Sequence, residues 1–146
     1  MRVIQPSVHF LCTTAVILAV WPAAAANDSF GAIAYSTTSN RAATAQSWRS
    51  SDEAGRLALA DCNRGSPAKD CFIAAAFQNA CGALAIDDHG TWGAWWKSQS
   101  EPGGAGVSAA LGVGRSRARE QCRRYAAGHA AECRVVAELC AVAFHP

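Results

Sequence analysis

The sequence predicts an α+β fold with a duplicated strand-strand-helix-strand unit, two helices packed on antiparallel sheet, and three disulfides. The first observation is a repeat. GAIAYS at 31–36 returns as GALAID at 82–87, and DCFIAAAFQNAC at 70–81 is echoed by ECRVVAELC at 132–140. The second is that each copy holds one helical stretch ending in a cysteine. The third is an even cysteine count after the N-terminal segment is removed. We expect both helices on one side of the six strands.

Composition describes an ordinary globular chain. The protein has 146 residues, of which 51% are apolar and 16% charged, and its formal net charge is +2. These values are typical of one domain. A charge this small indicates neither a nucleic-acid partner nor a strongly acidic one.

Residues 1–26 are typical of an export signal. Arg2 is the only formal charge before Asp28, and an apolar stretch runs over 10–21. Ala24 and Ala26 then supply the small residues that signal cleavage requires. The apolar stretch is shorter than the roughly 20 residues that a membrane-spanning helix needs, although a retained anchor is the alternative.

Removal of this signal would leave a single duplicated domain at 27–146. We place repeat one at about 30–81 and repeat two at about 82–140. The location expected for such a chain is secreted or periplasmic, without stable membrane insertion after signal cleavage.

The first copy shows strand and helix signals in turn. Residues 30–36 alternate and are followed by a polar turn, as in a strand. Ser50 and Glu53 form a capping-box pattern, after which apolar residues recur at helical spacing up to Cys62. The expected elements are strands at 30–36 and 42–48, a helix at 51–63, and a buried strand at 71–77.

The second copy has the same order. It also has an insertion, QSEPGGAG at 99–106, that accounts for the change in offset from 51 residues (Phe30 to Cys81) to 60 (Cys62 to Cys122). The expected elements are strands at 82–87 and 91–97, a helix at 108–125, a loop at 126–131, and a strand at 133–140.

Six cysteines remain after loss of Cys12 with the signal. An even count in an exported chain predicts a disulfide framework, for which 15 pairings exist in principle. A zinc site is the alternative, but the sequence has no CxxC spacing. The six are Cys62, Cys71, Cys81, Cys122, Cys133 and Cys140.

The predicted elements narrow this choice. Cys133 and Cys140 lie seven residues apart in one predicted strand. That is about 23 Å, whereas bonded cysteines need Cα atoms within about 7 Å. Each helix ends at a cysteine and a short loop leads to the next, which favours the local pairs Cys62–Cys71 and Cys122–Cys133. Cys81 and Cys140 remain, at equivalent repeat positions, and their bond is expected to tie the two copies together.

These features together resemble a known family. GAIAYS, a helix ending in cysteine, DC before an apolar strand, NACGALA, and the later tryptophan-rich and cysteine-containing strands are similar to the bacterial secreted domain-of-unknown-function family 4189. The resemblance covers Phe30 to Cys140, and NACGALA is its most distinctive piece. It implies export and a small cysteine-tied domain. It supplies no reaction, cofactor or catalytic residue.

Asp87, Asp88 and His89 form the densest polar cluster. An acid beside a histidine is suited to acid–base chemistry or to metal binding, which would make the protein a small secreted hydrolase. A tight turn explains the same residues through backbone preferences alone. We therefore predict no catalytic residues, no metal and no cofactor, and keep the hydrolase as the alternative.

Two further sets are candidate binding residues. In a strand, Trp92 and Trp96 point to one face and Trp95 to the other, so at least one could be exposed, although core packing explains most of them. Arg115, Arg119 and Arg123 form a helix stripe that could meet an acidic partner or simply face solvent.

The favoured function is a disulfide-stabilised non-enzymatic binding module of the inhibitor or effector type. It would recognise a protein or an envelope glycan rather than nucleic acid.

Overall fold

Both copies adopt the strand-strand-helix-strand order. The computed structural model describes residues 28–98, 106–126 and 132–142, so the signal segment and most of the insertion and of the loop at 126–131 lie outside the described residues. The first unit contains β1 (Phe30–Ser36), β2 (Arg41–Ser47), α1 (Ser51–Gly65) and β3 (Phe72–Gln78). The second contains β4 (Ala80–Ile86), β5 (Trp92–Ser98), α2 (Gly106–Tyr125) and β6 (Arg134–Cys140).

Each unit builds its own three-stranded antiparallel sheet. The strand orders are β2-β1-β3 and β5-β4-β6, so the first strand of each unit is central. The register shifts once in each sheet, between Ile33 and Ala34 and again between Leu84 and Ala85. The duplication therefore extends to the irregularity of the strand pairing.

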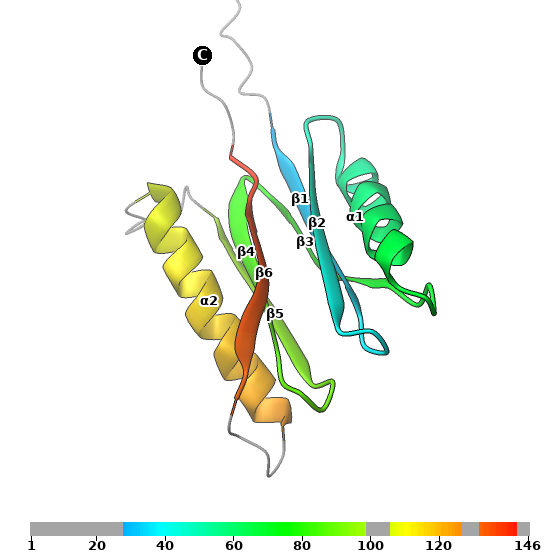
Figure 1. Ribbon diagram of the computed structural model, residues 1–146. Helices are drawn as coiled ribbons and strands as arrows, with labels where there is room; N and C mark the ends of the chain where they lie inside the picture. Colours follow the sequence, from blue (N-terminus) through cyan, green and yellow to red (C-terminus); the bar gives the residue numbers. More distant parts are fainter. Residues whose placement is uncertain (1–27, 99–105, 127–131, 143–146) are drawn as a thin grey trace, which may run out of the picture.

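The helices lie on opposite outer faces of the molecule, not on one side of six strands. α1 covers the first sheet, α2 covers the second, and the two sheets pack face to face between them (Figure 1). The expectation of one shared helix side is wrong because β1 and β4 are apolar on both faces. One face of each strand takes a helix and the other takes the opposite sheet.

Side-chain size differs between the two faces of the central strands. The larger residues Ile33, Tyr35, Leu84 and Ile86 fill the space between the sheets. Toward the helices the buried residues at the middle of the central strands are alanines, and these alanines meet a stripe of small helix residues in which an alanine or glycine recurs every four positions. Small residues on both sides allow the helices to approach the sheets closely.

Phe77 shows why the glycine of GAIA and GALA recurs. A Cβ atom built on Gly31 would lie 2.3 Å from the Phe77 ring, and one on Gly82 would lie 2.4 Å from it. The ring is buried between the sheets against both central strands. Each glycine therefore makes room for the same aromatic side chain.

The three disulfides have the expected pairing: Cys62–Cys71, Cys81–Cys140 and Cys122–Cys133. The expectation that Cys81–Cys140 joins the two copies is wrong. β4 begins at Ala80, so both cysteines belong to the second sheet, where they lie directly opposite each other. The register gives Phe30 and Gln78 as the equivalent pair in the first sheet.

The units are joined by the single residue Asn79 and by the core between the sheets. Asn79 adopts a left-handed conformation with φ of 48°, which asparagine tolerates better than most residues. Its amide donates to the Ser29 carbonyl at 2.8 Å, and its Oδ1 accepts from the Ser29 amide at 2.9 Å. The second unit ends in the same way, since the Ala141 amide donates to the Ala80 carbonyl at 2.9 Å.

Candidate functional site

Asp87 is a structural acceptor at the end of β4. It is 3% exposed, and its Oδ1 accepts hydrogen bonds from the amides of His89 at 2.9 Å and Thr91 at 2.8 Å. Burial acts to raise the pKa of Asp87, but the hydrogen bonds from Thr91 and His89 outweigh it and the pKa is lowered. The carboxylate therefore holds the turn in place.

Asp88 takes no part in the hydrogen bonds by which Asp87 holds the turn. Asp88 instead forms an exposed ion pair with Arg134 of β6. The hollow beside the turn is lined by Gly90 and Thr91 but not by Asp87, Asp88 or His89. Across the described ranges no group of three His, Cys, Asp or Glu residues is placed to hold a metal ion.

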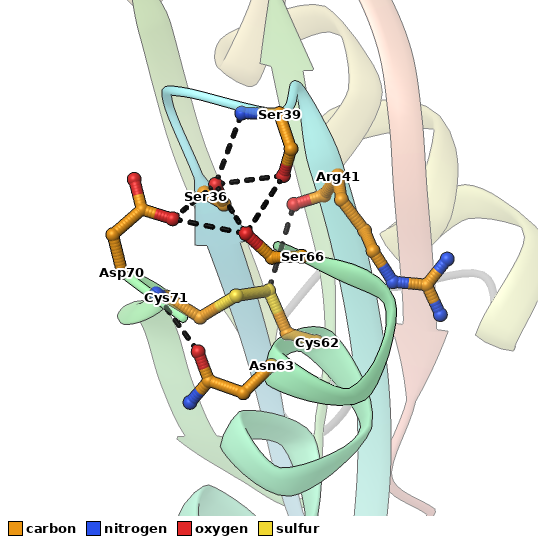
Figure 2. The surroundings of a disulfide bond; sticks show 8 residues. All are labelled: Ser36, Ser39, Arg41, Cys62, Asn63, Ser66, Asp70 and Cys71. Carbon is orange, nitrogen blue, oxygen red and sulfur yellow. Dashed lines mark hydrogen bonds between the residues drawn. A yellow bond between two sulfur atoms is a disulfide. The ribbon is translucent and has the colours of Figure 1, made fainter. Parts of the chain in front are cut away.

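A second polar cluster lies beside the Cys62–Cys71 disulfide (Figure 2). Asp70 Oδ1 accepts from Ser36 at 2.6 Å and from Ser66 at 3.1 Å, and Ser39 donates to the Ser36 hydroxyl at 2.8 Å. These hydrogen bonds, with that of Ser36 first, hold the pKa of Asp70 far below its ordinary value. Through these hydrogen bonds the cluster braces the β1–β2 turn against the end of α1.

The three tryptophans of β5 have different environments. Trp92 packs against the core between the sheets, with its ring centroid 5.3 Å from that of Phe72. Trp95 and Trp96 are 43% and 49% exposed. Trp95 lies on the side of β5 that faces α2, and Trp96 on the side that faces the other sheet.

The arginines of α2 form two sets. Arg115 makes a forked ion pair with Glu138 of β6 through distances of 2.5 and 2.7 Å, and with Arg119 it lines an open hollow against that strand. Arg123 is exposed. Glu120 bridges Arg124 at 2.5 Å and Arg117 at 2.8 Å, and these two hydrogen bonds lower the pKa of Glu120. Glu120 and Arg124 are four residues apart, which places them on the same face of the helix.

A groove lies between β5 and the C-terminal half of α2, and we call it the aromatic groove. It consists of two adjoining hollows of about 150 and 410 Å³ that share Gln121 and Tyr125. The smaller hollow is also lined by Trp95, Arg117, Glu120 and Arg124, and the larger by Gly90, Thr91 and Trp92. Tyr125 is 68% exposed and stands at the shared edge.

Close contact between helix and strand creates this groove. A Cβ atom on Gly93 would lie 2.4 Å from the Cys122 amide nitrogen and 2.6 Å from the Ala118 carbonyl oxygen, so the α2 backbone rests directly on β5 there. The Cys122–Cys133 disulfide fixes the same turn of the helix. Trp95 lies two residues along on the same side of the strand. Its indole cannot fit beneath the helix and forms a wall beside it.

The duplication provides an internal comparison for the groove. The strand register places Ala42 and Ala45 of the first unit where the second has Trp92 and Trp95. Alignment of the helices on Cys62 and Cys122 matches Leu57, Asp61 and Gly65 of α1 with Arg117, Gln121 and Tyr125 of α2. The first unit thus forms the same strand and helix without either indole of the groove, or its tyrosine. Trp95 and Tyr125 are therefore not required to form this strand and helix.

Sequence reasoning identified part of this site and missed the rest. Among the predicted binding residues, Trp92 and Trp95 line the aromatic groove, while Trp96 and the stripe of Arg115, Arg119 and Arg123 do not. The missed residues are those of α2, chiefly Gln121 and Tyr125. A comparison of α2 with α1 at an offset of 60 residues would have shown both as departures from the repeat.

The groove combines apolar ring faces with a few polar atoms. Its rings offer flat apolar faces, and the buried Gln121 Oε1 accepts no hydrogen bond from the described residues. The one carboxylate of the lining, Glu120, is held between two arginines. Among the described residues, the lining contains no serine, cysteine or histidine, and its hydroxyl groups are those of Thr91 and Tyr125.

Fold and groove together define a small, disulfide-tied, duplicated α+β domain with one specialised surface. The chain belongs to the family described as Domain of unknown function (DUF4189), which matches residues 30–140. Comparison with the curated proteins and with the solved structures gives no match.

Proposed function

We propose that the protein is an exported, non-enzymatic binding module that recognises a protein of the cell envelope through the aromatic groove. The observation that carries this proposal is the difference between the units. The two copies share elements, register and local disulfide, yet where the second places Trp95, Gln121 and Tyr125 around a hollow, the first has Ala45, Asp61 and Gly65. Large aromatic side chains at the surface are typical of binding sites. Exposed apolar surface that binds no partner favours aggregation.

The proposed location is secreted or periplasmic. Three disulfides support it, because such bonds persist in oxidising compartments, and so does the signal-like segment at 1–26. No helix in the described ranges is long and apolar enough to cross a membrane.

A protein partner is favoured over a glycan by the mixed lining. The smaller hollow combines an exposed indole with two arginines bridged by one glutamate, which together offer both signs of charge beside an apolar face. Tyrosine, tryptophan and arginine are the residues enriched at the centres of protein interfaces.

Photo-crosslinking from inside the groove tests the proposal. A benzoylphenylalanine at Tyr125 should form a protease-sensitive adduct when the protein is exported by its native host, and Trp95→Ala should remove that adduct. The matched control is the same photo-probe at Leu57, which is 47% exposed on the corresponding face of α1 and should give no adduct. Equal adducts at both positions, no adduct at Tyr125, or an adduct that only glycosidases degrade would contradict the proposal.

A further inference from the structure

The first unit fills, with its own side chain, the place that corresponds to the larger hollow. A Cβ atom on Gly65, the last residue of α1, would lie 2.2 Å from both Cζ and Nε of Arg41. The Arg41 side chain therefore lies across the end of α1, and its Nε is buried. An arginine thus packs between the start of β2 and the end of the helix.

The second unit changes both partners of this contact. Ser36 pairs with Arg41 in the first sheet, and Asp87 bonds to Thr91 at the equivalent place in the second, so Thr91 replaces Arg41. Tyr125 replaces Gly65. The tyrosine is 68% exposed and does not take over the space, because a hollow of about 410 Å³ is bordered by Thr91, Gln121 and Tyr125. The second unit therefore lacks the filler that the first unit has.

The polar atoms around this hollow favour a donor with positive charge. Gln121 Oε1, in the lining of the hollow, is buried and accepts no hydrogen bond from the described residues. Asp87 does not line the hollow, but its carboxylate lies behind Thr91, which does, and accepts a hydrogen bond from the Thr91 amide. The cations nearby already have acidic partners, since Arg124 binds Glu120 and Arg134 binds Asp88. A vacant acceptor in the lining, with the buried Asp87 carboxylate behind Thr91, matches a group that carries several N–H donors.

We infer that this hollow receives an arginine side chain of the protein partner, in the position where the first unit holds its own Arg41. The inference rests on the proposed binding function. A guanidinium group is planar, carries five donors and is weakly hydrated, so it can stack on the Tyr125 ring while donating to Gln121. Lysine shares the charge but lacks the flat, forked group.

Peptide titration followed by NMR tests the inference on the mature protein. We expect Ac-Gly-Arg-Gly-NH2 to shift the amide signals of Thr91, Gln121 and Tyr125 with a Kd on the order of 1–10 mM, as suits a single side chain. The citrulline peptide has nearly the same shape without the charge and should bind at least tenfold more weakly. Equal binding of arginine and citrulline peptides, or shifts that map elsewhere, would overturn the inference.

Variants that exchange residues between the units sharpen the test. Thr91→Arg supplies the second unit with the residue of the first and should abolish the arginine-induced shifts, while Trp96→Gln, which introduces the residue found at Gln46, should leave them intact. If Thr91→Arg does not fold, Gln121→Leu serves instead, since it keeps the volume and removes the acceptor. Retention of arginine binding in a folded variant of either kind would contradict the inference.

The two proposals can fail separately. A protein adduct at Tyr125 without arginine binding would refute the arginine inference and leave the binding module in place. Arginine binding without a protein adduct would refute the proposed function and leave an arginine-binding hollow.

Discussion

Phe77 is the side chain on which the contact between the two sheets depends most closely. Its ring fills the space above two glycines of different units, so neither central strand can carry a larger residue there without moving the other sheet. Adding atoms to a closely packed protein interior lowers its stability.

We expect Gly82→Ala to lower the free energy of unfolding by about 1–3 kcal/mol, because the added methyl group would lie 2.4 Å from the enclosed Phe77 ring. The matched control is Gly112→Ala on α2, where nothing lies within 4 Å and helix propensity predicts a gain of up to about 1 kcal/mol. Chemical denaturation measures both. A neutral Gly82→Ala would show that the ring has room to move.

Asp70 should make the free energy of unfolding depend on pH in the acidic range. Its pKa is lowered in the folded protein, so its contribution is fully present above the ordinary aspartate pKa of about 4 and is lost as the pH falls below that value. We expect Asp70→Asn to be less stable than the wild type at pH 7 and to lose less stability between pH 5 and pH 2. Asp52→Asn, at an exposed position in the first turn of α1, is the control. An unchanged acid dependence in Asp70→Asn would contradict this role.

At the scale of the elements, each helix is pinned to its sheet in the same way. A disulfide joins the helix end to the start of the next strand, through Cys62–Cys71 in one unit and Cys122–Cys133 in the other. The third bond differs, since it joins two strands that are already paired. The first sheet forms the same pairing with Phe30 and Gln78 and no bond.

Loop entropy predicts that the third disulfide, Cys81–Cys140, stabilises the protein most. Cys81–Cys140 closes 59 residues, against 9 and 11 for the local bonds. We expect the double alanine variant at Cys81 and Cys140 to lose about 1.5 kcal/mol more than either local double variant. Thermal denaturation of the three variants measures the order. A smaller loss for Cys81 and Cys140 would mean that the β4–β6 pairing persists in the unfolded chain.

Replacement of Trp92 and of Trp95 in β5 should have different effects on stability. Trp92→Ala is expected to lower the free energy of unfolding by about 3 kcal/mol, because its ring packs against Phe72 and the core between the sheets. Trp95→Ala should change it by less than about 1 kcal/mol, since the first unit has Ala45 there and the indole is 43% exposed. A comparable loss in the two variants would make Trp95 a core residue and remove it from the proposed site.

At the scale of the whole molecule, local sequence signals were sufficient to predict the helices, the strands and the cysteine pairs. The Ser50 hydroxyl accepts from the Glu53 amide at 3.1 Å, as the capping pattern predicts, and both local disulfides follow from a cysteine in the last turn of a helix before a short loop. Such features depend on neighbours in the chain, which a sequence displays directly.

The layer order and the groove could not be obtained in this way. An apolar run such as ACGALA is compatible with burial on both faces but does not say which face meets a helix and which meets a sheet. Gln121 and Tyr125 join Trp95 only because the α2 backbone rests on Gly93, and that contact depends on how the helix is rotated. Packing between residues that are far apart in the sequence leaves no periodic pattern in the sequence itself.

The central claim is that the two units are equivalent as scaffolds and that only the second carries a binding groove. A variant with Thr91→Arg, Trp95→Ala, Gln121→Asp and Tyr125→Gly gives the second unit the residues of the first at four groove positions. The decisive measurement is photo-crosslinking from Arg117 in this variant and in the otherwise unchanged chain. We expect the variant to fold with all three disulfides and to lose the adduct completely. A folded variant that keeps its adduct, or a variant that cannot fold, would contradict the claim.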